Sequence, residues 1–177
     1  MTVVIVSGPP GAGSSTAAKK VAEEIGLDYW SAGKFFKEES PGEGSVGVEK
    51  AWEDEELGSK DFHSDLDRRQ ALKAKRGDVV LDGKLAIRMA GEYADLAVWL
   101  TASLEERARR TAERDDLSLE EARKTVKARE RKDLENFQDI YGFDYRNQKE
   151  EADLVVDTDY KGPDEIVEVI LSRLGED

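Results

Sequence analysis

A glycine-rich segment between a strand and a helix constrains this chain most. The run Thr2–Val6 is β-branched and apolar, which is typical of a buried parallel strand, and Ser14–Ile25 carries apolar residues at helical spacing. Between them, Gly8–Thr16 has the sequence GPPGAGSST. Glycines in this arrangement let successive backbone N–H groups turn onto phosphate oxygens at the positive end of the following helix. The segment therefore predicts a phosphate-binding loop; the alternative is a plain strand-to-helix turn.

One position of this loop departs from the usual pattern. Ser14 stands where the pattern has a lysine, so the cation that reaches the outer phosphates is missing. Ser15 falls at the hydroxyl position that normally ligates Mg²⁺. The residues expected to bind the phosphates are Gly8, Pro9, Pro10, Gly11, Ala12, Gly13, Ser14, Ser15 and Thr16. The pattern thus predicts phosphate binding and leaves the rate of any phosphoryl transfer in question.

Apolar strand-like runs alternate with helical patterns along the rest of the chain, which favours an α/β fold with a doubly wound parallel sheet. The acidic, glycine-rich stretch Ser40–Ser59 interrupts this alternation, and we expect a mobile insertion there. A length of 177 residues favours one domain. Strands are expected at residues 2–7, 28–30, 78–82, 95–100 and 153–157.

Several helix starts carry recognisable capping chemistry. Ser103 with Glu106, and Ser118 with Glu121, match the capping box, in which a hydroxyl and a carboxylate satisfy each other's backbone N–H groups. Pro163 suits a first helical turn, so a last helix is expected from Pro163 to about Arg173.

The charge balance bears on the partners of the protein. With 40 acidic and 27 basic residues, the formal net charge is −13, which argues against a nucleic-acid partner. A small anionic ligand would need a local basic pocket. The acidity is alternatively an adaptation to a salty cytoplasm, a hypothesis that a loss of solubility on raising the salt concentration would contradict.

The sequence also disfavours a disulfide-linked or zinc-binding protein and a secreted or membrane protein. The chain has no cysteine and one histidine, which excludes disulfides, thiolate metal sites and a histidine cluster for zinc. Thr2 already lies in a predicted strand, which leaves no room for a signal peptide, and no apolar run approaches the roughly 20 residues that span a bilayer. We expect a cytoplasmic protein without a membrane partner, and a monomer.

Two predicted strands end in carboxylates. Asp82 closes the run Val79–Asp82, and ligands of open parallel sheets gather beyond the carboxyl ends of the strands. Asp82 can therefore hold Mg²⁺ near the loop phosphates, although a strand-end aspartate that makes a turn is the alternative. Asp157 and Asp159 either border a nucleotide base or form a solvated turn, and the turn is favoured.

Five segments of the sequence form a pattern that covers nearly the whole chain: Gly8–Thr16, Tyr29–Lys37, Leu66–Gln70, Val80–Ala86 and Ile140–Asp144. In their order and spacing they resemble the nucleoside monophosphate kinases, and most closely the archaeal type of cytidylate kinase. The resemblance implies transfer of a phosphoryl group from ATP to CMP or dCMP with Mg²⁺. It also implies a three-layer P-loop kinase fold with a five-stranded parallel sheet, a monophosphate-binding insertion at about 31–77 and a helical lid at about 107–141.

The resemblance also assigns roles to side chains. It implies catalytic roles for the arm arginines Arg110, Arg114 and Arg129. Lys34 is a further catalytic candidate because it could replace the loop lysine, and Asp82 is one as a metal ligand together with Ser15. Substrate-binding roles fall to Ser31, Gly33, Lys37, Asp67, Arg69 and Lys84. For the arginines, together with Arg107, the alternative is an exposed face on which Glu106, Arg109, Arg110 and Glu113 pair with one another. For Asp67 and Arg69 the alternative is an ordinary charge pair on a helix surface.

Two departures from the family pattern keep other functions open. Lys34 stands where the family commonly has an acid and is a candidate replacement for the missing loop lysine, with Lys19 and Lys84 as rivals, and Asn136 stands where an arginine is common. A degenerate kinase that binds nucleotide without turnover is therefore one alternative. An adenylate kinase is another, although the continuous helix predicted over residues 118–141 argues against the β-rich lid of many such enzymes.

Overall fold

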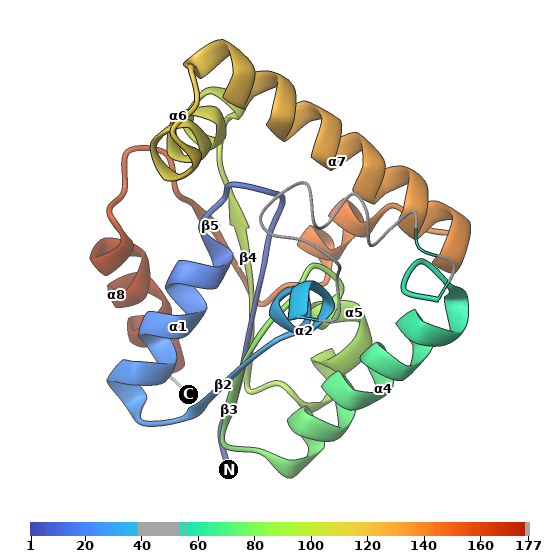
Figure 1. Cartoon of the computed structure of the whole chain (residues 1–177). Helices are drawn as coiled ribbons and strands as arrows, with labels where there is room; N and C mark the ends of the chain where they lie inside the picture. Colours follow the sequence, from blue (N-terminus) through green and yellow to red (C-terminus); the bar gives the residue numbers. More distant parts are fainter. Residues whose placement is uncertain (39–53, 55, 176–177) are drawn as a thin grey trace.

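The computed structural model describes residues 1–38, 54 and 56–175. Most of the insertion expected at Ser40–Ser59 lies outside these residues, as does the side chain of Lys37. The described chain contains a parallel sheet in the order β2-β3-β1-β4-β5 (Figure 1). The five predicted strands are confirmed, each bound within one residue. They are β1 Val3–Ser7, β2 Asp28–Ser31, β3 Val79–Asp82, β4 Leu96–Thr101 and β5 Leu154–Asp157.

Helices cover both faces of this sheet, so the predicted three-layer α/β fold is confirmed. Helices α1 and α8 lie on one face, and α4, α5 and α7 lie on the other (Figure 1). None of the helices in the described part of the chain combines the length and apolarity needed to cross a membrane. The helices are α1 Ser14–Ile25, α2 Ala32–Glu38, α4 Lys60–Arg76, α5 Ala86–Ala90, α6 Leu104–Asp115, α7 Leu119–Tyr141 and α8 Pro163–Leu174, with 3₁₀ turns η1 Gly91–Tyr93 and η2 Tyr145–Glu150.

The first strand shows why the chain adopts this arrangement. Every residue of β1 is buried, because its side chains point alternately to two apolar layers. Val4 and Val6 pack in the layer that contains Val21 of α1. Ile5 packs in the opposite layer, which contains Tyr145 of η2. The continuous apolar run of the sequence therefore reflects a central strand buried on both faces.

The two predicted capping boxes differ in outcome. At α7 the box is complete: the Ser118 hydroxyl accepts from the Glu121 N–H, and the Glu121 carboxylate accepts from the Ser118 N–H at 3.0 Å. At α6 the Ser103 hydroxyl accepts from the Glu106 N–H, but the Ser103 N–H donates to Asp159 Oδ1 at 2.8 Å. The second half of that predicted box is wrong, because a tertiary contact takes its donor.

Helices α6 and α7 form an arm that is fixed to the phosphate loop by a buried arginine. Arg107 of α6 pairs with Glu130 of α7 at 3.1 Å, and its guanidinium also donates to the Pro10 carbonyl at 3.3 Å. Its side chain is only 9% exposed. Arg107 therefore has a structural role between the two helices and the loop.

The α7 capping box generates a stability prediction. Replacing Ser118 by alanine leaves an N–H of the first helical turn without its acceptor, so we expect Ser118→Ala to lower the free energy of unfolding by about 1 kcal/mol. Urea unfolding followed by circular dichroism measures this change. Ser172→Ala, at an exposed serine inside α8, is the control and should leave stability unchanged or slightly higher. Equal stability of the two variants would contradict the capping role.

Candidate active site

The carboxyl ends of the strands open into a cleft of about 760 Å³. Its walls come from the phosphate loop, the ends of β2 and β3, helices α2, α4, α6 and α7, and the start of α8. The structure brings most of the predicted site residues together here. They are Gly8, Pro9, Pro10, Gly11, Gly13, Ser14, Ser15, Thr16, Ser31, Gly33, Lys34, Asp67, Asp82, Lys84, Arg110, Arg114 and Arg129.

Two predicted residues with described side chains do not line this cleft. Ala12 of the loop is fully buried beneath it. Arg69 lies outside the cleft lining: it pairs with Asp65 at 2.6 Å and its guanidinium lies 5.3 Å from the centre of the Phe35 ring. Asp67 and Arg69 therefore do not act as a pair, because positions two apart on a helix face different sides.

The loop geometry explains the glycines of the motif. Gly11 and Gly13 adopt left-handed φ values of +82° and +94°, which side chains rarely tolerate. A Cβ on Gly11 would also lie 3.0 Å from the Cβ of Arg107. Gly13 caps α1 without a side-chain acceptor, so the first N–H groups of that helix have no side-chain cap and are available to a phosphate.

Asp82 forms a buried polar centre at the end of β3. The residue is 5% exposed, and its Oδ2 accepts from the hydroxyls of Tyr29 and Ser31, each at 3.0 Å. The Ser31 hydroxyl in turn accepts from the Lys34 N–H at 3.1 Å. Burial, followed by the Asp82 charge, raises the pKa of Tyr29 to about 12, so this hydroxyl stays a donor. These bonds run to β2, and they do not form the turn that was the alternative for Asp82.

This centre fits a magnesium ion that is also held by phosphate. The hydroxyl of Ser15 and the carboxylate of Asp82 both interact with the Tyr29 hydroxyl, so two hard oxygen donors lie near one point. Mg²⁺ bound to nucleotides commonly takes one or two protein oxygens and completes its shell with phosphate and water. Among the described residues there is no cluster of three or more metal-ligating side chains. The donors therefore suit a nucleotide-bound Mg²⁺ and not a metal held by protein alone.

The lysines near the loop have other partners. Lys34 is exposed on the first turn of α2, with its ammonium 3.6 Å from a Glu38 carboxylate oxygen. Lys84 follows β3 and pairs at 2.5 Å with Asp133 of α7, whose side chain is 2% exposed. Lys161, which the sequence gave no reason to select, lines the cleft at the turn before α8. Lys34 and Lys84 therefore line the cleft with a carboxylate partner each.

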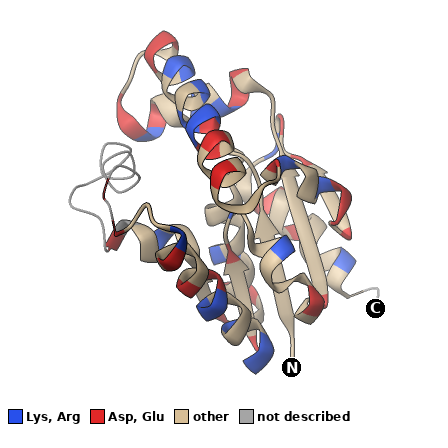
Figure 2. Cartoon of the chain, turned by 90° about the vertical axis from the view of Figure 1, so that its right-hand side faces the viewer, with Lys and Arg blue, Asp and Glu red and all other residues tan. Residues whose placement is uncertain are grey.

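The arm arginines divide between two roles. Arg114 pairs with the adjacent Asp115 at 2.7 Å but is half-exposed at the cleft. Arg129 also lines the cleft, and its Nε is buried without a hydrogen-bond partner among the described residues. Arg109 pairs with Glu106 and Glu113, as the mixed-charge alternative predicted. Figure 2 shows how closely acidic and basic residues follow one another along the helices.

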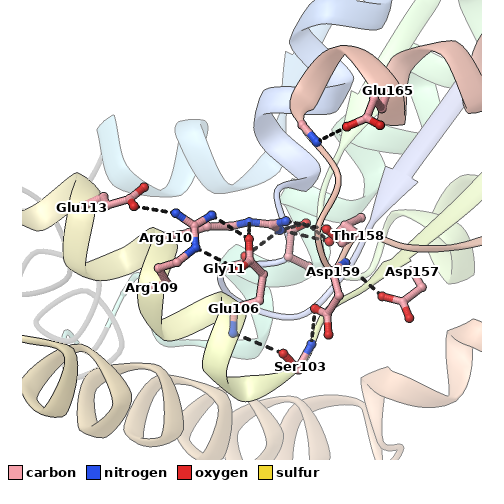
Figure 3. Close-up of polar contacts among 12 residues, drawn as sticks. Gly11, Ser103, Glu106, Arg109, Arg110, Glu113, Asp157, Thr158, Asp159 and Glu165 are labelled. Atoms are coloured by element: carbon pink, nitrogen blue, oxygen red, sulfur yellow. Dashed lines mark hydrogen bonds and ion pairs between the residues drawn. The ribbon is translucent and has the colours of Figure 1, made fainter.

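Arg110 lines the cleft, but its hydrogen bonds run to the phosphate loop and to the turn after β5. Its guanidinium donates to the Ala12 carbonyl at 3.0 Å and to the Thr158 carbonyl at 2.7 Å, and Nε pairs with Glu106 at 3.0 Å (Figure 3). This geometry favours a contact with the loop backbone over the predicted contact with a transferring phosphoryl group. Asp157 and Asp159 accept from backbone N–H groups, which agrees with the favoured turn.

The far end of the cleft is built by α4. Tyr141 of α7 donates its hydroxyl to Asp67 Oδ2, which joins α4 to the arm. Burial lowers the pKa of His63 to about 4, so its imidazole is neutral. Gln70 is 1% exposed and also lines the cleft. Sequence reasoning missed His63 and Gln70, because helical spacing alone did not show which face of α4 meets the cleft.

Solved structures resemble this fold over its full length. An uncharacterised protein from Eubacterium ventriosum matches with a TM-score of 0.71 at 12% identity and full coverage of both chains. Shikimate kinase from Aquifex aeolicus matches with a TM-score of 0.63 at 15% identity, over 99% of this chain and 97% of its own. At these identities the likeness shows the fold alone.

Sequence relatives are more specific. A cytidylate kinase from Ignicoccus hospitalis is 45% identical over 176 residues, which cover 98% of this chain and 99% of the relative. A cytidylate kinase from Methanopyrus kandleri is 36% identical over 183 residues, 97% and 92% of the respective chains. The model of the cytidylate kinase-like family matches residues 3–160. The resemblance predicted from the sequence is thereby confirmed, and the chain belongs to the cytidylate kinase-like family.

Proposed function

We propose that this protein is an ATP-dependent kinase of CMP or dCMP. One observation carries the proposal: in a chain of the cytidylate kinase-like family, one cleft joins the phosphate loop and the Asp82 centre to an end formed by α4. The first end suits the triphosphate of ATP, and the second suits a nucleoside monophosphate. The proposed partners are therefore these two nucleotides.

The chemistry needs positioning and positive charge more than covalent help from the protein. A phosphate oxygen of CMP attacks the γ-phosphorus of ATP, the bond from that phosphorus to the bridging oxygen breaks, and ADP and CDP result. Arg114 and Arg129 line the cleft on the arm and are proposed to contact the phosphates during transfer. Asp133 holds Lys84 at the end of β3, where its ammonium would meet the acceptor phosphate.

Ser15 and Asp82 are proposed to hold Mg²⁺ together with the nucleotide. The ion supplies positive charge to the phosphate oxygens. Tyr29 and Ser31 of β2 fix the orientation of the Asp82 carboxylate, because both hydroxyls donate to the same carboxylate oxygen.

The acceptor base is proposed to lie against α4. Asp67 accepts from the Tyr141 hydroxyl and lines the cleft, so its carboxylate can also accept from the amino group of cytosine. Burial raises the pKa of Asp67 to about 6, and the Tyr141 hydrogen bond opposes this shift. Gly33 lines the same cleft and Lys37 follows it on α2, and both remain proposed acceptor contacts with Ser31.

Ser14 favours a second candidate, a nucleotide-binding protein with little or no turnover. The loop keeps its glycine conformations, but the ammonium groups of Lys34 and Lys84 are each paired with a carboxylate. Lys19 is exposed on α1 and is not among the cleft-lining residues. The two candidates share nucleotide binding and differ in rate.

A coupled assay with ATP, Mg²⁺ and each of CMP, dCMP, UMP and AMP tests the proposal. We expect CMP or dCMP to be the preferred acceptor. Ser14→Lys should raise kcat by about 10²-fold to 10³-fold, because a positioned donor on the outer phosphates is regained.

Three outcomes of this assay are decisive. Equal kcat for the wild type and Ser14→Lys would show that another cation compensates for Ser14. Preference for AMP would contradict the proposed acceptor. Nucleotide binding without turnover in both proteins would contradict the kinase proposal. Ser14→Ala is the matched control, because it changes the same position without adding charge.

The Asp67 pKa generates a prediction about stability and pH. The folded protein holds this proton more tightly than the unfolded chain, whose aspartate pKa is about 4. The stabilising effect of the neutral carboxyl is therefore complete below pH about 4 and is lost as the pH rises through about 6.

Asp67→Asn should accordingly gain stability relative to the wild type as the pH rises from about 4 to about 6, with a constant difference above that range. Urea unfolding at a series of pH values measures the trend without substrate. Ser64→Ala, at an exposed position of the same helix, is the control for a surface substitution. A difference between Asp67→Asn and the wild type that does not vary with pH would refute the assigned pKa.

A further inference from the structure

The side of the phosphate loop that faces α6 carries backbone carbonyl groups. A loop whose N–H groups face a phosphate directs carbonyl groups the other way, and buried carbonyls need donors. Ala12 is fully buried, and its carbonyl lies on the side of α6 and the end of β5. The groups that satisfy this carbonyl therefore help to define how the N–H groups are presented.

Arg110 is the main donor. Its Nη1 lies 3.0 Å from the Ala12 carbonyl oxygen and 3.5 Å from that of Gly11, while Nε pairs with Glu106 at 3.0 Å (Figure 3). The side chain is 21% exposed. The planar guanidinium is a rigid fork, so several bonds made at once fix its position and that of the backbone it touches.

Thr158 completes the arrangement from a different part of the chain. It is fully buried just after β5, and both its hydroxyl and its carbonyl accept from Arg110, at 3.0 and 2.7 Å. The Thr158 hydroxyl oxygen also lies 3.1 Å from the Ala12 carbonyl and 3.0 Å from that of Thr101. Helix α6, the phosphate loop and the turn before α8 thus meet at one point.

That turn leads directly to the end of the cleft where ATP is proposed to bind. Lys161, Gly162 and Pro163 line it, three to five residues after Thr158. A displacement of Thr158 would therefore move a wall of the cleft as well as release the loop carbonyl.

We propose that Arg110 and Thr158 form a loop brace, a pair of positioning residues that hold the phosphate loop in the shape that binds the triphosphate of ATP. The proposal deepens the proposed function. It gives Arg110 a part in ATP binding through the loop backbone, without contact to the transferring phosphoryl group. The acceptor end of the cleft, built by α4, is independent of this brace.

Isothermal titration calorimetry with MgATP alone, and separately with CMP, tests the brace. Arg110→Lys keeps the charge but loses the fork, and should weaken MgATP binding by about tenfold to about hundredfold. Thr158→Val keeps the size but removes the hydroxyl, and should weaken MgATP binding by a smaller factor. Thr158→Ser restores a hydroxyl and should recover most of the loss. CMP binding should change by less than about twofold in all three variants.

Arg123→Lys is the matched control, because Arg123 is exposed on α7 and pairs with Glu105 away from the loop. It should bind both nucleotides as the wild type does. If Arg110→Lys weakens MgATP and CMP binding equally and lowers the unfolding temperature, the residue supports the fold generally and the brace is refuted. Unchanged MgATP binding with reduced kcat would refute it too, and would return Arg110 to a catalytic role.

The calorimetric test does not depend on whether the protein phosphorylates CMP. MgATP binding is measured without turnover, so a wild type that fails to phosphorylate CMP would refute the kinase proposal and leave the brace to be decided by calorimetry. If Arg110→Lys does not fold, the Thr158→Val and Thr158→Ser pair decides: equal MgATP affinity in both refutes the brace.

Discussion

The opposed directions of the backbone groups in the phosphate loop are the constraint on which the rest of the structure depends. The first N–H groups of α1 have no side-chain cap, whereas the Pro10 and Ala12 carbonyls of the loop accept hydrogen bonds from α6. Arg107 and Arg110 donate to them, and Gly11 leaves no room for a side chain beside Arg107. The arm and the turn before α8 are therefore placed by the same loop that is proposed to bind ATP.

The shape of the phosphate loop does not depend on the charge of the side chain at position 14. The loop keeps its shape through glycine conformations and outer hydrogen bonds, neither of which involves the side chain at Ser14. The missing lysine therefore leaves the fold intact. What it removes is a positive charge that would stabilise the phosphoryl group during transfer. Arg109 pairs with Glu106 and Glu113, and Arg110 binds the loop backbone, so the proposed phosphate contacts on the arm are Arg114 and Arg129, which line the cleft.

Local sequence patterns predicted local structure well and tertiary partners poorly. The Ser118 capping box formed because both partners lie on one helical turn, whereas the box at Ser103 was broken by Asp159, which is 56 residues away. Asp67 and Arg69 were both assigned to the substrate from one segment that resembles the family, but only Asp67 lines the cleft. The contacts of Arg110 with Thr158 span 48 residues, and no pattern in one sequence pairs them.

The sequence by itself determined the alternation of strands and helices, the phosphate loop and the family. These features follow from side-chain periodicity, backbone freedom at glycine and motif spacing, all of which are local. Tertiary structure alone decided which charged side chains are available to a nucleotide. A guanidinium or ammonium group reaches several ångströms from its backbone and binds whichever acceptor packing brings near, so Arg110 and Lys84 found partners 48 and 49 residues away that their spacing did not indicate.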